Sequence, residues 1–271
     1  MRKTRKHLIW LTIAAVVAIV SGEIFARYYL GLGTPPLSIT HKKIEYMFKP
    51  NQDVKRFGNH IITNQYGMRT APFAVHKADG EFRIMVFGDS VLNGGNQTDH
   101  AALATTIMYE RLSVAKQRVV IGNISAGSWG PGNWLAYAKE YGFFGADIVV
   151  LVISSHDYAD NPTFEVLNEN THPTKNPVSA LLEGIIRYLP RYLPQLDTGG
   201  AVSESDRFTM KVNEQEVQKG LNDLKDFLEL AKKSSISVLV YQHWEKEEIE
   251  RGVPKHGNQR IRDVCESIGI S

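Results

Sequence analysis

The chain has 271 residues, of which 43% are hydrophobic and 22% are charged, proportions that fit a folded globular domain. The formal net charge is only +2, so no overall positive field argues for a nucleic-acid partner. The single cysteine, Cys265, excludes an intramolecular disulfide and a cysteine-based metal site. Its place in an amphipathic stretch predicts a small buried hydrophobe.

The N-terminus has the pattern of a membrane anchor. Four basic residues lie within the first six positions, and an apolar run over residues 8–20 follows at once. Extended to Leu30, this stretch reaches the roughly 20 residues that a membrane-spanning helix needs. Cleavage of a signal peptide after Gly22 is the alternative, but the usual Ala-x-Ala site is absent, and we favour an uncleaved anchor over residues 1–30. In either case, the basic end stays in the cytoplasm and the rest is exported.

Residues 31–80 are expected to form a connector. The Gly-Leu-Gly-Thr-Pro-Pro sequence that begins at Gly31 cannot continue a helix. The stretch after it is polar and irregular, with short apolar pieces such as Ile61-Ile62. The folded domain is therefore placed at residues 81–271.

Beyond this connector, strand-like and helix-like segments alternate. Short apolar runs predict strands at residues 82–87, 118–124, 148–153 and 236–241. Helices are predicted at residues 101–117 (with Asp99 as N-cap), 133–144, 178–188, 217–231 and 258–268. This alternation implies right-handed crossovers and a parallel sheet. We therefore predict a three-layer α/β/α sandwich with a flavodoxin-like sheet, tethered by the N-terminal helix.

Ligands of such sheets bind beyond the carboxyl ends of the strands, so the residues that follow each strand are the candidate site. Gly88-Asp89-Ser90 follows the first strand. A serine at a tight strand-to-helix turn exposes its hydroxyl beside backbone amides that can hold an oxyanion. The Gly-Lys-Ser/Thr ending of a phosphate-binding loop is absent, and Asp89 would repel phosphate, which counts against a nucleotide-binding module.

Glycines and a histidine follow the next two strands. A glycine-rich loop around a tryptophan offers Gly127 or Gly130 as the second oxyanion donor, and the residues leave open which one. His156 comes directly after the third strand, within Ser154-Ser155-His156-Asp157, in a polar cluster suited to a site. Surface roles are expected for the histidines that lie in loops or at helix starts without metal-ligand spacing, namely His41, His60, His76, His100, His172 and His256.

These strand ends resemble the blocks of the SGNH (GDSL-like) hydrolase superfamily. Block one is matched by Gly88-Asp89-Ser90, and block two, a glycine amide donor, by Gly127 or Gly130. Block three, Gly-x-Asn-Asp, aligns with residues 154–157, so that His156 stands where the family has Asn; an imidazole N–H can also donate to an oxyanion. Membrane-anchored bacterial members are further resembled upstream, through Pro50-Asn51 and an Asn-x-x-Gly-x-Arg segment from Asn64 to Arg69.

The resemblance implies a serine esterase that acts on acyl, O-acetyl-like esters of an envelope substrate. Ser90 would attack the carbonyl, the oxyanion donors would be as matched above, and Asp89 and Asp157 would contact substrate. Neither a cofactor nor a metal is expected. The implied location is the bacterial inner membrane, with one spanning helix and the catalytic domain outside the cytoplasm. The implied partners are the lipid bilayer and an acylated small molecule or polysaccharide, without nucleic acid.

The chain departs from the family at block five, the Asp-x-x-His that supplies the general base. No aspartate of this chain is followed by His three residues later. We expect the chain to stop before this block; otherwise another histidine substitutes, with His243 the first candidate and His156 the second. Without a base, a serine is a weak nucleophile. Two rival functions therefore stay open: a catalytically inactive glycan-binding module and an O-acyltransferase.

Overall fold

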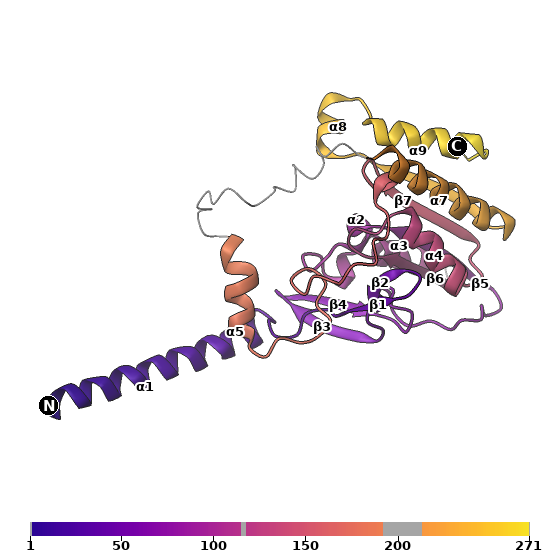
Figure 1. Ribbon diagram of the computed structural model, residues 1–271. Coiled ribbons are helices and arrows are strands. Elements are labelled where there is room, and N and C mark those ends of the chain that lie inside the picture. Colours follow the sequence, from indigo (N-terminus) through magenta and orange to yellow (C-terminus); the bar gives the residue numbers. More distant parts are fainter. Residues whose placement is uncertain (1, 115–117, 192–212, 271) are drawn as a thin grey trace.

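The computed structural model describes residues 2–114, 118–191 and 213–270 (Figure 1). Helix α1 (Arg2–Ile24) continues as the π-helical turn η1 (Phe25–Tyr29) and projects away from the rest of the molecule (Figure 1). Over residues 5–29 this helix is long and apolar enough to cross a membrane, and no residue of its most apolar stretch is buried against the rest of the protein. A signal sequence has the same properties.

Residues 31–80 contain two antiparallel hairpins, so the expectation of an irregular connector is wrong. The hairpins pair β1 (Ser38–His41) with β2 (Glu45–Phe48) and β3 (Gln52–Arg56) with β4 (Asn59–Thr63). Both residues of the β3-β4 turn, Phe57 and Gly58, have positive φ, as a two-residue type I′ turn requires. The segment also packs into the main core through Ile44, Tyr46, Met47 and Met68.

Within the described residues, the parallel sheet has four strands, at positions that the apolar runs predicted to within two residues. Its strands lie in the order β6-β5-β7-β8, and their bounds are β5 (Glu81–Gly88), β6 (Arg118–Ser125), β7 (Ile148–Ser154) and β8 (Ser237–His243). The protein is thus a mixed α/β structure with a parallel sheet and an N-terminal apolar helix.

One face of the sheet carries the main core. It is covered by α4 (Pro131–Tyr141), α7 (Glu214–Lys233) and α9 (His256–Ser267), whose apolar side chains meet alternate residues of β5 and β7. A smaller cluster on the other face joins Met108 of α3 (Ala104–Ser113) to β5 and β6. Leu239 and Tyr241 of β8 stay more than half exposed, so this second layer is partial.

All five predicted helices differ from the observed ones in their bounds, the last two by no more than three residues at either end. The helix expected at residues 101–117 is split, because Leu103 is extended between η2 (His100–Ala102) and α3, and Asp99 caps η2 instead; residues 115–117 lie outside the described part of the chain. The helix expected at 133–144 begins at Pro131, a residue suited to a first helical turn. The segment expected at 178–188 forms α5 (Ala180–Glu183), η4 (Gly184–Tyr188) and η5 (Leu189–Arg191).

Candidate active site

The loops that follow the four parallel strands meet at one edge of the sheet. Gly88 is in register with Ser125, and Ser154 is in register with His243. Three short helices begin at this edge: α2 (Ser90–Asn93), η3 (Asp157–Ala159) and α8 (Lys246–Arg251).

Ser90 is the first residue of α2 and is exposed, whereas Asp89 beside it is only 2% exposed. The Asp89 carboxylate caps the short helix by accepting a hydrogen bond from Val91 N at 2.9 Å. A side chain at Gly88 would place its Cβ 2.9 Å from that of Leu92, so the turn needs a glycine before Asp89. Trp134 Nε1 donates to the Gly88 carbonyl at 3.0 Å and fixes the end of the strand.

Arg69, the last residue of the Asn-x-x-Gly-x-Arg segment, ties down the loop after Ser90. Its guanidinium is buried and donates to the backbone carbonyls of Asn93, Gly95 and Thr98. Burial lowers the pKa of this guanidinium to about 10. Asn64 shapes the turn that leads to it, because its Oδ1 accepts from the amides two and four residues later. The segment therefore stabilises the loop that follows Ser90.

Gly127 and Gly130 differ in what their amides can do. Gly130 N donates to Asn133 Oδ1 at 3.0 Å as the N-cap of α4, and a Cβ there would meet the backbone of Asp160. Gly127 has open space around its Cα and lines one pocket together with Ser90. The two glycines that sequence could not separate thus lie in different surroundings.

His156 lies among three carboxylates, and its side chain is 28% exposed. Its Nδ1 is 3.1 Å from Glu245 Oε1, while its Nε2 is 3.3 Å from Asp157 Oδ1 and 3.8 Å from Asp89 Oδ2. Sequence reasoning missed Glu245, which stands two residues beyond β8 and approaches β7 only through the parallel pairing of the two strands.

Hydrogen bonds hold Glu245 ionised. Burial alone would raise the pKa of this carboxyl, but hydrogen bonds from Lys255, His156 and Ser155 outweigh it and lower the pKa to about 2. The Lys255 ammonium lies 2.7 Å from Glu245 Oε2 and the Ser155 hydroxyl 2.8 Å from Oε1. A fixed negative charge therefore faces Nδ1 of His156 at neutral pH.

Two aspartates near His156, Asp157 and Asp160, have raised pKa values. Burial and the charge of Asp89 raise the pKa of Asp157 well above its ordinary value, and Asp157 Oδ1 has no hydrogen-bond donor among the described residues. Burial also raises the pKa of Asp160 to about 6. One ligand atom each from Asp89, His156 and Asp157 lie within 4.8 Å of one another, a grouping that could hold a metal ion.

His243 lies two strands away from the strand that leads to Ser90. It ends β8, the outer strand, and its Nδ1 is 3.4 Å from Ser154 Oγ, at the end of the neighbouring strand β7. The hydrogen bond that the structure gives the Ser90 hydroxyl goes to Asp89 Oδ2 at 3.5 Å. His243 as the base stays a prediction, and so do the substrate contacts of Asp89 and Asp157, whose carboxylates are both buried.

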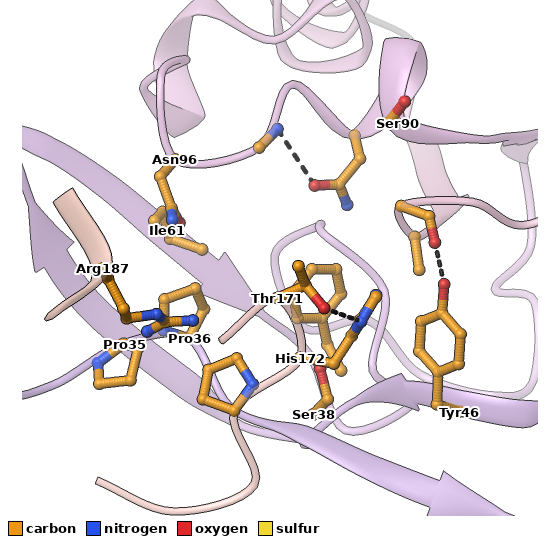
Figure 2. Close-up of a pocket in the computed structure, with 16 residues that line it drawn as sticks. Pro35, Pro36, Ser38, Tyr46, Ile61, Ser90, Asn96, Thr171, His172 and Arg187 are labelled. Atoms are coloured by element: carbon orange, nitrogen blue, oxygen red, sulfur yellow. Dashed lines mark hydrogen bonds between the residues drawn. The ribbon is translucent and has the colours of Figure 1, made fainter. Parts of the chain in front are cut away.

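The pocket beside Ser90 is lined by a histidine for which the sequence predicted only a surface role. His172 lines this pocket with Ser90, Gly127 and Tyr46 (Figure 2). It hydrogen-bonds the Gly127 carbonyl, which Tyr46 OH also contacts, and burial lowers its pKa. No spacing in the sequence links residues so far apart; the first hairpin brings Tyr46 to the site.

Comparison with known proteins adds no assignment to this geometry. No protein-family model matches the chain, and no curated protein sequence matches it.

Proposed function

We propose that the protein is a membrane-anchored serine esterase of the SGNH type, with Ser90 as its nucleophile. The observation that carries this proposal is the position of Ser90: it is exposed at the turn from a buried parallel strand into a helix, and it lines a pocket with Gly127. The strand order supports the finer fold, a three-layer flavodoxin-like sandwich. In such sheets the second strand of the chain lies on one side of the first and the third strand lies on the other, as β6 and β7 do beside β5.

The oxyanion would be held by the amides of Ser90 and Gly127. Gly127 is preferred over Gly130 because the amide of Gly130 already donates to Asn133. Backbone donors aimed at the developing oxyanion account for a large part of catalysis in acyl transfer.

His156 is the base that the geometry favours, in place of its expected role as an oxyanion donor. The ionised Glu245 accepts from Nδ1, and Nε2 lies 3.8 Å from Asp89 Oδ2, the oxygen that accepts from the Ser90 hydroxyl. An acid that orients one imidazole nitrogen so that the other takes the serine proton is the logic of a catalytic triad. Catalytic hydrogen bonds are often long in unliganded enzymes and shorten when substrate binds.

In the proposed reaction, Ser90 Oγ bonds to the acyl carbon while its proton passes to Nε2 of His156. The C–O bond of the ester then breaks, and the alcohol leaves with that proton. Water repeats the sequence on the acyl-enzyme, which releases the acid and restores the serine. Given the N-terminal helix, the proposed substrates are acyl esters of envelope molecules outside the cytoplasm. An O-acyltransferase would share the acyl-enzyme and differ only in passing the acyl group to a glycan instead of water.

One observation favours the alternative of a catalytically inactive glycan-binding module: the Ser90 hydroxyl is bonded to Asp89 and not to a histidine. Such a module would keep the pocket and lack the activated serine.

Labelling of the full-length protein with a fluorophosphonate probe separates these two functions. An activated serine displaces fluoride from the probe, so we expect labelling of the wild type and its loss in Ser90→Ala. Ser128→Ala, at an exposed serine of the neighbouring loop, is the matched control and should label normally. Absence of labelling in well-folded wild type would favour the binding module, and products formed with and without a glycan acceptor would separate hydrolysis from transfer.

A further inference from the structure

A row of exposed apolar side chains runs along the helical segment from α5 to η5. Its members are between 43% and 56% exposed and recur at spacings of three and four residues: Leu182, Ile185, Ile186 and Leu189. The opposite side of the same segment is buried, with Ala180 at 0% and Glu183 at 4%. A helix whose outer face is apolar instead of polar lacks the usual solvent-facing surface of a water-exposed helix.

This segment is fixed to the far end of the candidate membrane helix. The Glu23 carboxylate of α1 accepts from Ser179 Oγ at 2.8 Å and from the amides of Ala180 and Leu181 at 3.0 and 2.9 Å. The Leu181 side chain also packs on Gly22, where an added Cβ would lie 3.2 Å from it. α1 therefore caps the start of α5 directly.

The other end of the attachment is a buried ion pair. Glu183 bonds Arg56 of β3, and the two side chains are 1% and 0% exposed. Arg56 also donates to Tyr188 OH at 2.8 Å, one turn further along the segment. The segment is thus held both to α1 and to the second hairpin, and it runs crosswise to α1 (Figure 1).

We propose that the apolar face of residues 182–189 lies in the interface of the same bilayer that α1 crosses. This inference rests on the membrane placement of α1 and not on the esterase activity. α1 is apolar from Leu8 to Val20, and α5 meets it at Gly22 and Glu23, in the turn that follows this stretch. That depth is the boundary of headgroups and acyl chains, where helices with a strong apolar face lie flat.

Exposed aromatic residues at the same level support lipid as the occupant of this face. Phe25, Tyr28 and Tyr29 of η1 are 53%, 82% and 74% exposed, and aromatic rings of this kind gather at membrane interfaces. The segment also lies directly against α1, because the Leu181 side chain packs on Gly22.

The test places one fluorescent label at a time on the full-length protein in phosphatidylcholine vesicles, in a Cys265→Ala background. The three labelled positions are Ile186→Cys on the segment, Val16→Cys on α1, and Val253→Cys, an exposed residue near α8 at the opposite end of the molecule (Figure 1). Quenching by lipids that carry a nitroxide near the headgroup, or deep in the acyl chain for the label at 16, is compared with quenching by aqueous iodide.

We expect headgroup nitroxides to quench the label at 186 several-fold more than the label at 253, with iodide showing the reverse order. Lipid quenching at 16 but only iodide quenching at 186 would overturn the proposal and leave the anchor intact. Iodide quenching at both 16 and 186 would overturn this proposal and also the membrane placement of α1. Protection at 186 from iodide and lipid alike, dependent on protein concentration, would instead show that a second copy of the chain covers this face. None of these results depends on labelling of Ser90, so failure of the esterase proposal is read separately.

Discussion

Glu245 is remote from His156 in the sequence, and its carboxylate faces Nδ1 of that histidine. If its charge orients His156, Glu245→Gln should lower the rate of fluorophosphonate labelling by roughly 10- to 1000-fold, because the imidazole loses the acceptor for Nδ1. Glu247→Gln is the matched control, since this exposed carboxylate of α8 pairs with Arg251 and Lys255. Equal rates in the two variants would remove Glu245 from the mechanism.

Asp160 gives a prediction about pH. Its pKa in the folded protein is about 6, above the ordinary value of 3.8. Between these two pH values the folded state therefore holds a proton that the unfolded chain has already lost. The resulting loss of stability is absent below about pH 4, develops as pH rises toward 6 and is complete above it. Asp160→Asn should therefore stabilise the protein by about 1–3 kcal/mol at pH 7.5 and have little effect at pH 4.

Thermal unfolding of the detergent-solubilised protein at the two pH values checks this prediction. Asp79→Asn, at an exposed aspartate, should leave the unfolding temperature unchanged at both. A gain from Asp160→Asn that is the same at pH 4 and pH 7.5 would contradict the assignment.

At the residue scale, the sequence predicted that Ser90 stands at a turn, but it did not predict all the residues that surround it. The string Gly-Asp-Ser after an apolar run was enough to predict an exposed serine at a turn. Glu245 and His172 were missed because their approach depends on strand pairing and on the first hairpin, neither of which leaves a local pattern. The amide of Gly130 is engaged by a side chain three residues ahead, a contact that only the cap geometry reveals.

At the scale of elements, three glycines bring helices close to the loop that carries His156. A Cβ at Gly130, Gly220 or Gly257, which belong to the start of α4, to α7 and to α9, would meet backbone carbonyls of Asp160, Tyr158 and Ser155 respectively. Close helix packing at these points thus sets the position of residues 155–160.

Gly257→Ala should push the Ser155 carbonyl away from α9 and move His156 with it. We expect a loss of roughly 1–3 kcal/mol in the free energy of unfolding and slower fluorophosphonate labelling of the protein that remains folded. Gln259→Ala on the exposed side of α9 is the control and should change neither. Denaturant unfolding and labelling rates measured on the same samples give both quantities, and an unchanged Gly257→Ala would contradict the packing argument.

The strands were the elements easiest to predict, because β5 and β7, at the centre of the sheet, are nearly continuous apolar runs. The hairpins of residues 31–80 were not, since their strands have four or five residues and the β3-β4 turn has Phe-Gly in place of the usual Asn-Gly signal. Leu103, whose extended backbone divides the helix predicted at 101–117, has no helix-breaking residue beside it from which the break could be predicted.

For the whole molecule, the main question is whether α1 stays attached. An uncleaved anchor predicts that the protein remains in membranes after an alkaline carbonate wash and keeps its N-terminal residues. Ala14→Arg with Val17→Arg should release it, because each charge at the centre of a spanning helix costs about 2.5–3.5 kcal/mol. Leu239→Arg, a charge added on the exposed edge strand β8, is the control and should stay membrane-bound. A mature chain that begins after Gly22 would show a signal peptide instead.

The pocket beside Ser90 is bounded on another side by Arg187, a residue of η4, the segment attached to the end of α1 (Figure 2). The candidate nucleophile and the segment attached to α1 therefore line the same pocket. A substrate embedded in lipid would be met by lateral diffusion, without first leaving the leaflet. Turnover would then follow the mole fraction of substrate in the membrane, so that adding inert lipid at constant total substrate would slow the reaction.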